Sequence, residues 1–377
     1  MKSLFYAKKL IGYNSVSSRT NREVSLYIEN KLKKHGFATE RITYLDKNKI
    51  RKFNIVGKKG GGYGGLAYAC HSDVVPADRW HSKTKGPFQP GIARDRLYGR
   101  GSCDMKGSIA CMLEAVQAVS WDKMKYPIYF ICTADEECGY GGARQVAARS
   151  DYYREIVEHQ TPMIIGEPTL LEVIYAHKGS YLIEILSKGV SGHSSTREGK
   201  NANLAMIPVL NEAKKIHDEL ETESRWQNDL FDPPSMSWNI GINDQTEAIN
   251  MTPARSRCTI YFRPMPSVDF EPLLQRLEKK VAEQGLLMRK NYYGEPVLTD
   301  PKSEFVESAL ELSRKRKART VSYGTDGGAF KDVKNKIIFG PGNIAQAHTF
   351  NEWIAIEQLS LGTQMFSKFL QRYCCED

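Results

Sequence analysis

The sequence predicts an α/β fold with two domains: a largely parallel central sheet flanked by helices, and an inserted α+β domain with an antiparallel sheet and two helices. The first observation is the length of 377 residues, beyond the size at which single cores usually stop growing. The second is that strand-like and helix-like segments alternate in both end portions. The third is that the middle portion lacks this alternation. We therefore expect residues 1–176 and 293–377 to form one domain and residues 177–292 the other.

The N-terminal portion supplies a helix and two strands. Apolar residues recur at helical spacing across 21–34, and Gly36 follows where a helix would end. Residues 53–56 and 66–70 are predicted strands, joined by the glycine-rich run 58–65. A phosphate-binding loop would lead into a helix, whereas this run leads into a strand, so we interpret it as a flexible turn.

The remaining elements follow the same periodicities. In the end portions we expect a helix after Gly107, strands at 128–132 and 336–340, a strand end within the run 162–168, and an amphipathic helix from about 354 to 373. In the middle portion we expect strands at 181–186, 237–242 and 256–263, and helices at 202–221 and 270–284.

Composition indicates an ordinary globular protein, with 41% hydrophobic and 26% charged residues. No apolar run approaches the length of a membrane span, and residues 1–9 lack the apolar core of a secretory signal, so we expect neither export nor a membrane partner. The eight cysteines form no C-x-x-C pair, and most lie in apolar runs, as reduced thiols do. This pattern favours a cytoplasmic location.

The net charge of +9 raises two possibilities, a nucleic acid and an anionic small molecule. The basic residues are spread along the chain apart from short clusters such as 314–317, and no nucleic-acid motif accompanies them. We therefore expect no nucleic-acid partner and only a weak preference for anionic ligands.

Two adjacent glutamates, Glu136 and Glu137, follow the apolar run 128–132. At a strand end the chain turns, and both side chains can enter one cleft. One carboxylate can then hold a cation while the other moves protons. The ordinary alternative is a solvated acidic loop.

Similar residues recur at other predicted strand ends, and in open α/β sheets such ends converge on the ligand site. The candidates are His71, Asp104, Glu136, Glu137, Glu167 and His348. Two histidines and three carboxylates can hold two divalent cations if one carboxylate bridges them, and this donor set without thiolate suits zinc, cobalt or manganese. Six candidates minus five ligands leave one carboxylate that holds no metal. A two-metal site with such a free carboxylate is suited to the hydrolysis of an amide. For Asp104 the alternative is a simple helix cap.

Together these residues resemble a known family, the M20 metallopeptidases. The resemblance extends over nearly the whole chain and rests on five segments: His71-Ser-Asp-Val-Val-Pro76, Gly99-Arg-Gly-Ser-Cys-Asp104-Met-Lys-Gly107, Asp135-Glu136-Glu137, Gly166-Glu167-Pro168 and Ala345-Gln-Ala-His348-Thr349. It implies a metal-dependent amidohydrolase with two divalent cations, zinc first and cobalt or manganese as alternatives.

The resemblance also implies a ligand set. His71 and Glu167 would hold one metal, Glu137 and His348 the other, and Asp104 would bridge them.

Two further roles in the same site follow from the resemblance. Asp73 would hydrogen-bond the free ring nitrogen of His71, as metal-bound histidines generally require. Glu136 would be the general base that takes a proton from the attacking water and returns it to the leaving amine.

The middle portion matches the family's dimerisation and lid domain. His193, in Ser191-Gly-His-Ser-Ser195, would reach the neighbouring subunit's site and stabilise the oxyanion, which implies a homodimer with shared sites. Arg263 would grip the substrate carboxylate, and Asn239 is a further candidate for substrate contact. For Arg263 the alternative is a surface charge at a strand end.

The expected substrate is an N-acyl amino acid. The runs 166–169 and 175–179 are similar to family members that hydrolyse N-acetyl-L-ornithine, our first expectation. The run 324–328 departs from them and is closer to desuccinylases and carboxypeptidases, so N-succinyl-diaminopimelate is the second. A catalytically silent metal-binding relative is a third reading, and the presence of Glu136 beside all five ligands argues against it.

Overall fold

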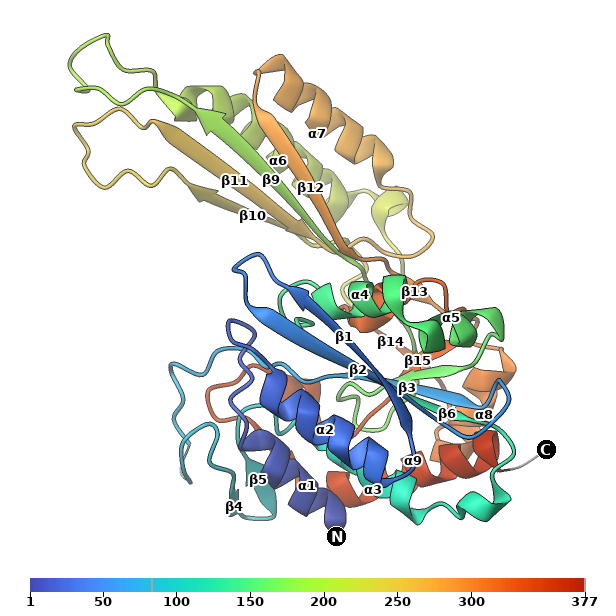
Figure 1. Cartoon of the computed structure of the whole chain (residues 1–377). Coiled ribbons are helices and arrows are strands. Elements are labelled where there is room, and N and C mark those ends of the chain that lie inside the picture. Colours follow the sequence, from blue (N-terminus) through green and yellow to red (C-terminus); the bar gives the residue numbers. More distant parts are fainter. Residues whose placement is uncertain (83, 376–377) are drawn as a thin grey trace. The chain divides into compact units, whose positions relative to one another are not determined.

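The computed structural model describes residues 1–82 and 84–375, which divide into two compact units (Figure 1). The first comprises residues 1–176, 297–319 and 325–377, and the second residues 177–296 and 320–324. Among the described residues, no helix is both long and apolar enough to cross a membrane.

The first unit is built on a sheet whose order is β1-β2-β6-β3-β7-β15-β8-β13. The strands are β1 (Ala38–Leu45), β2 (Arg51–Lys59), β3 (Leu66–His71), β6 (Ile128–Thr133), β7 (Met163–Ile165), β8 (Ile174–His177), β13 (Val297–Leu298) and β15 (Lys336–Ile338). A further short strand, β14 (Arg319–Val321), begins at the last residue of the segment 297–319 and continues into the second unit. The four strands β6, β3, β7 and β15 are mutually parallel, whereas β2 and β1 join antiparallel at one side.

The central parallel strands are buried along their whole length. Every residue of β3 and β6 is buried, which explains why both read as continuous apolar runs rather than as alternating patterns. The helices of this unit are α1 (Lys2–Ile11), α2 (Arg22–Lys34), α3 (Lys106–Ala118), α4 (Gly141–Arg149), α5 (Asp151–Glu158), α8 (Glu304–Ser313) and α9 (Ile356–Cys374). Helices α3 and α9 contact β3, and Figure 1 shows α4 and α5 on the other side of the sheet.

A small three-stranded sheet lies in the first unit as well, in the order β16-β5-β4. Its strands are β4 (Gly91–Ala93), β5 (Arg96–Tyr98) and β16 (Trp353–Ala355). Residues 354 and 355 were expected to begin the last helix, and that expectation is wrong because this segment pairs with β5 before α9 starts.

The second unit is an antiparallel sheet with two long helices. The sheet order is β10-β11-β9-β12, with β9 (Ser180–Lys188), β10 (Trp238–Asn243), β11 (Arg255–Phe262) and β12 (Leu287–Gly294). Helices α6 (Ala202–Thr222) and α7 (Glu271–Glu283) contact each other, and α6 also contacts β9 and β11. The predicted fold class is confirmed. Strands β1 and β12 were not predicted, because both are edge strands with only one fully buried residue each, so neither gives a clear apolar pattern.

Candidate metal centre

The candidate site is built at the carboxyl ends of the parallel strands. His71 is the last residue of β3, whereas the glutamate pair begins three residues after the end of β6 and Glu167 lies two residues after the end of β7. Because parallel strands end at the same edge of a sheet, residues distant in sequence converge there.

Asp104 lies between the two histidines. Its Oδ1 is 3.0 Å from His71 Nε2, and its Oδ2 is 3.4 Å from His348 Nε2. The same nitrogen of His348 lies 3.0 Å from Glu137 Oε2. Donor atoms of His71, Asp104 and Glu137 all lie within 4.8 Å of one another, close enough to hold a metal ion.

The other two glutamates approach His71. Its Nε2 lies 3.6 Å from Glu167 Oε1 and 4.0 Å from Glu136 Oε2. The structure thus brings together all six residues proposed at strand ends, and the side chains of the four acids are at most 9% exposed. The His348 side chain is 56% exposed, so it forms the open side of this cluster within the first unit.

Burial and mutual repulsion perturb the carboxyl groups. Burial raises the pKa of Glu136 and of Glu167 well above the usual value. Burial and the charge of Asp104 raise the pKa of Glu137 to about 7. Burial would also raise the pKa of Asp104, but hydrogen bonds from the two histidines lower it and keep this group ionised.

The pKa values of the two histidines are raised as well, because the surrounding carboxylates favour their charged form. Burial by itself would lower the pKa of His71, but the carboxylates of Glu167 and Asp104 raise it overall. Contacts with Asp104 and Glu137 raise the pKa of His348 to about 10. A bound positive charge would therefore stabilise the ionised form of these clustered, buried carboxyl groups.

This donor set fits divalent cations. Glu137 Oε1 is buried and has no hydrogen-bond partner within the described part of the chain, which leaves an acceptor aimed at no protein donor. The set contains only nitrogen and oxygen donors, which suits zinc, cobalt and manganese.

Two sequence interpretations change in detail. His71 Nδ1 lies 3.0 Å from the backbone carbonyl of Asp73 and 3.6 Å from its carboxylate. The Asp73 carboxylate instead accepts the backbone N–H groups of Glu136 and Glu137, at 3.2 and 3.3 Å. It therefore fixes the turn that carries both glutamates. The reading of Asp104 as a helix cap is wrong, because Met105 occupies that position and no side chain caps α3.

Comparison with known proteins gives the family. The model of peptidase family M20/M25/M40 matches residues 67–372. The chain belongs to this family. An acetylornithine deacetylase of Proteus mirabilis (strain HI4320) is 31% identical to it, covering 86% of this chain and 83% of the relative. One from Myxococcus xanthus is 30% identical, covering 97% of this chain and 96% of the relative.

Solved structures share the fold of this M20 protein. An M20 family metallo-carboxypeptidase from Sulfolobus solfataricus superposes with a TM-score of 0.76 at 18% identity, covering 99% of each chain. A dinuclear metal-binding peptidase of the M20 family from Bacillus subtilis superposes with a TM-score of 0.64 at 14% identity, covering 98% of this chain and 96% of the other. The family match and the acetylornithine deacetylase relatives together make the M20 protein a metal-dependent hydrolase of amides.

Sequence reasoning did not single out Glu352 as part of the M20 site. Its buried carboxylate accepts hydrogen bonds from the backbone N–H groups of Gly101, Cys103 and Asp104 at 2.8–3.0 Å, and from Arg100 Nη1 at 2.8 Å. The available signal was its position four residues after His348.

Three residues around the glutamate turn also went unrecognised. Lys52 Nζ lies 2.8 Å from Asp135 Oδ1, and Tyr44 donates its hydroxyl to Asp135 Oδ2 at 2.6 Å. Asp326, in the run 324–328, is buried and accepts a hydrogen bond from the Thr133 hydroxyl. A lysine directly before the apolar strand segment 53–56 was the available signal for Lys52.

The remaining predicted residues belong to the second unit. His193 is exposed in a loop, with Nδ1 2.7 Å from the Ser195 hydroxyl. Arg263 follows β11 and donates to the Ser180 hydroxyl at 2.7 Å. Asn239 is exposed on the edge strand β10. The roles predicted for these three residues in catalysis and substrate binding remain predictions.

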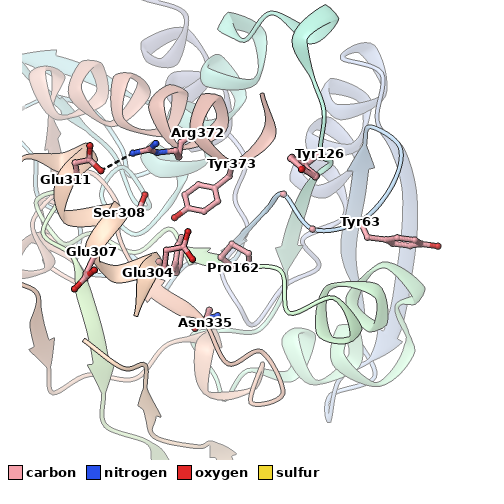
Figure 2. A pocket seen from close by; sticks show the side chains of 13 residues that line it. Tyr63, Tyr126, Pro162, Glu304, Glu307, Ser308, Glu311, Asn335, Arg372 and Tyr373 are labelled. Carbon is pink, nitrogen blue, oxygen red and sulfur yellow. Dashed lines mark hydrogen bonds and ion pairs between the residues drawn. The ribbon is translucent and has the colours of Figure 1, made fainter. Parts of the chain in front are cut away.

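A separate cavity of about 660 Å³ lies in the first unit (Figure 2). Its lining includes the α8 residues Glu304, Ser308 and Glu311, together with Tyr373 of α9. Glu311 pairs with Arg372 at 2.9 Å across one wall. The cavity shares no residue with the metal centre, so the M20 chemistry does not take place there.

Proposed function

We propose that this M20 enzyme hydrolyses N-acetyl-L-ornithine to L-ornithine and acetate. The observation that carries the proposal is the placement of Asp104 between His71 and His348, with Glu136 beside them. The relatives named acetylornithine deacetylase, about 30% identical over most of the chain, support this substrate.

The ligand set divides around Asp104. His71 and Glu167 would hold one cation, Glu137 and His348 the other, and the two oxygens of Asp104 would serve both, as their separate contacts with the two histidines suggest. Bound cations would make water nucleophilic at neutral pH and polarise the amide carbonyl. Zinc is our first choice for both positions.

Glu136 is the group left to move protons. Its carboxylate is buried, and its raised pKa suits a base that must bind a proton at the operating pH. Glu136 Oε2 takes one proton from the attacking water and gives it to the amine nitrogen as the amide C–N bond breaks. The second proton of that water is lost when the acetic acid product ionises, and it converts the α-amino group of ornithine to an ammonium group. The products are then acetate and L-ornithine, and atoms and charge balance.

We assign catalysis to the first unit. The second unit would serve as the dimerisation domain and as a lid. His193 would stabilise the oxyanion in the partner subunit's site of a homodimer, since its exposed ring is free to meet another chain. Arg263 would bind the substrate carboxylate through its planar fork, and Asn239 would contact the substrate. The eight free cysteines suit a cytoplasmic enzyme.

A substrate panel tests the proposal. Purified enzyme is assayed with N-acetyl-L-ornithine, N-succinyl-diaminopimelate, N-acetylcitrulline and small dipeptides, and Glu136→Gln protein prepared in parallel controls for contaminating hydrolases. We expect the highest kcat/KM with N-acetyl-L-ornithine, loss of activity after chelation, and recovery with zinc or cobalt. A higher kcat/KM with the succinylated substrate or a dipeptide would refute the substrate. Activity that survives proven removal of metal would refute the mechanism.

A further inference from the structure

We propose that Glu352 is a positioning residue that holds the bridging ligand Asp104 at a fixed place relative to His348. The inference rests on the ligand set proposed above and is independent of the acetylornithine substrate. Glu352 touches neither cation in this arrangement; it acts through the backbone of the loop that carries Asp104.

The hydrogen bonds of Glu352 are all directed at that loop. Oε1 accepts the N–H groups of Cys103 at 2.8 Å and of Asp104 at 3.0 Å. Oε2 accepts the N–H of Gly101 at 2.9 Å and the Arg100 guanidinium at 2.8 Å. A single buried carboxylate therefore organises the whole stretch that leads to the bridging ligand.

The backbone of Glu352 ties the same two segments together. Its carbonyl accepts the N–H of Gly99 at 3.1 Å, and the next residues, Trp353–Ala355, pair with Arg96–Tyr98 in the β16–β5 ladder. The ladder fixes the segments up to position 99, and the carboxylate continues the connection up to Asp104. His348 lies four residues before Glu352, so both ligand-bearing loops start from one anchor.

The energetic case follows from burial. Glu352 is 1% exposed and its partner Arg100 is 2% exposed. If either side chain were removed, water could not reach the other to take over its hydrogen bonds. Hydrogen bonds to charged groups are stronger than neutral ones, and a donor left unpaired in a buried place is costly. Losing the carboxylate would release several N–H groups of the loop at once.

Metal centres are sensitive to such supports, because ligands must be held in the geometry that the cations require. Asp104 contacts both histidines, so a shift of its backbone would disturb the position of either cation. The cation between Glu137 and His348 should suffer most, since His348 is the exposed ligand.

The test measures metal binding in the absence of substrate. Metal-free wild type, Glu352→Gln and Glu352→Asp are titrated with zinc by calorimetry, and bound metal is counted after dialysis. Glu352→Gln places an N–H₂ group against backbone N–H donors. Glu352→Asp keeps the charge that faces Arg100, so it serves if the glutamine variant does not fold. For each variant we expect one metal equivalent to bind roughly 10–100-fold more weakly, the range typical for outer supports of metal ligands.

Two reference variants distinguish a general loss of stability from a wrong ligand set. Glu29→Gln removes another buried carboxylate of the same unit, which bonds Arg41, Lys33 and Thr39 but no ligand loop. It should lower Tm without changing either zinc affinity. His348→Ala removes a proposed ligand and should lose one metal equivalent.

The outcomes are then distinct. If His348→Ala keeps both equivalents, the ligand set is wrong, and the inference falls with it. If His348→Ala loses one equivalent while the folded Glu352 variants bind both as tightly as wild type, the ligand set stands and the positioning role is overturned. Weak binding of one equivalent in the Glu352 variants, with Glu29→Gln unchanged, supports the role.

Discussion

Lys52 of β2 lies 2.8 Å from the carboxylate of Asp135, the residue directly before the two glutamates of the metal centre. Asp135 has a φ of 57°, in the left-handed region that non-glycine residues seldom adopt. Its other oxygen accepts the Tyr44 hydroxyl. The turn that aims Glu136 is therefore held from two neighbouring strands, β1 and β2.

Removing one of these supports should slow catalysis. In Tyr44→Phe the 2.6 Å hydrogen bond to Asp135 is lost, and we expect kcat to fall roughly tenfold, because a hydrogen bond to a charged group contributes ~1.5–3 kcal/mol. The measurement is steady-state kinetics with metal content checked. Tyr129→Phe is the matched control, since its hydroxyl donates to Glu155 on α5, and it should leave kcat unchanged. Equal kcat values in the two variants would contradict the role of Tyr44.

The two adjacent glutamates should respond differently to the same substitution. Glu136→Gln removes the proton carrier, so we expect kcat to fall by about 10²–10⁴-fold while both metal equivalents remain bound. Glu137→Gln removes a proposed ligand, so we expect one equivalent to bind more weakly. Metal counts after dialysis and turnover rates, measured on the same samples, check both. Near wild-type turnover in Glu136→Gln would refute its assignment as the base.

His193 can be tested by mixing subunits. His193→Ala should lose activity and keep its metal, because His193 is proposed to act on the partner subunit's substrate. Mixing it in equal amounts with Glu136→Gln would create hybrid dimers with one complete site, and about a quarter of wild-type activity should return. Subunit exchange is verified by native mass spectrometry. Exchange without recovery of activity would exclude a shared site.

Lys336, in β15, should make stability depend on pH. Burial lowers its pKa to about 8 from 10.5, and its amine donates to the carbonyls of Phe330 and Val333. Between pH 8 and 10.5 the unfolded chain therefore binds more protons than the folded one, so this group makes folding more favourable as pH rises. The contribution over the window is about 3 kcal/mol, and it is lost as pH falls through 8.

The comparison is between wild type and Lys336→Met, both free of metal, by calorimetry from pH 7 to 10.5. Wild-type Tm should rise relative to that of the variant across the upper part of this range. A difference in Tm that stays constant with pH would show that the lysine is not held uncharged.

Much of the fold could be predicted because its signals are local. The runs at 66–70 and 128–132 are buried on both faces of the sheet, and such strands need apolar residues at every position. The residues that follow parallel strands meet at one edge, which is why the strand-end rule led to the cluster around His71.

The supports of the site could not be predicted in the same way. Lys52 meets Tyr44 through the β1–β2 register and meets Asp135 because β2 runs antiparallel to β6. Both facts depend on strand order, which no local pattern contains. Likewise, the hydrogen-bond partners of Glu352 lie about 250 positions earlier in the chain. They follow strand β5, whose pairing with β16 was not foreseen because residues 354 and 355 were expected to be helical.

The position of β15 in the central sheet has a consequence for the order in which the molecule is assembled. β15 pairs with both β7 and β8, yet it is made long after them, and His348 follows it. During synthesis β7, the strand that precedes Glu167, can pair with β3 but lacks its second neighbour until β15 is made, and four of the five proposed ligands exist before the fifth. Both proposed ligand pairs are complete only once residue 348 has been made and β15 has joined the sheet, so we expect stable metal loading to follow that step rather than to precede it.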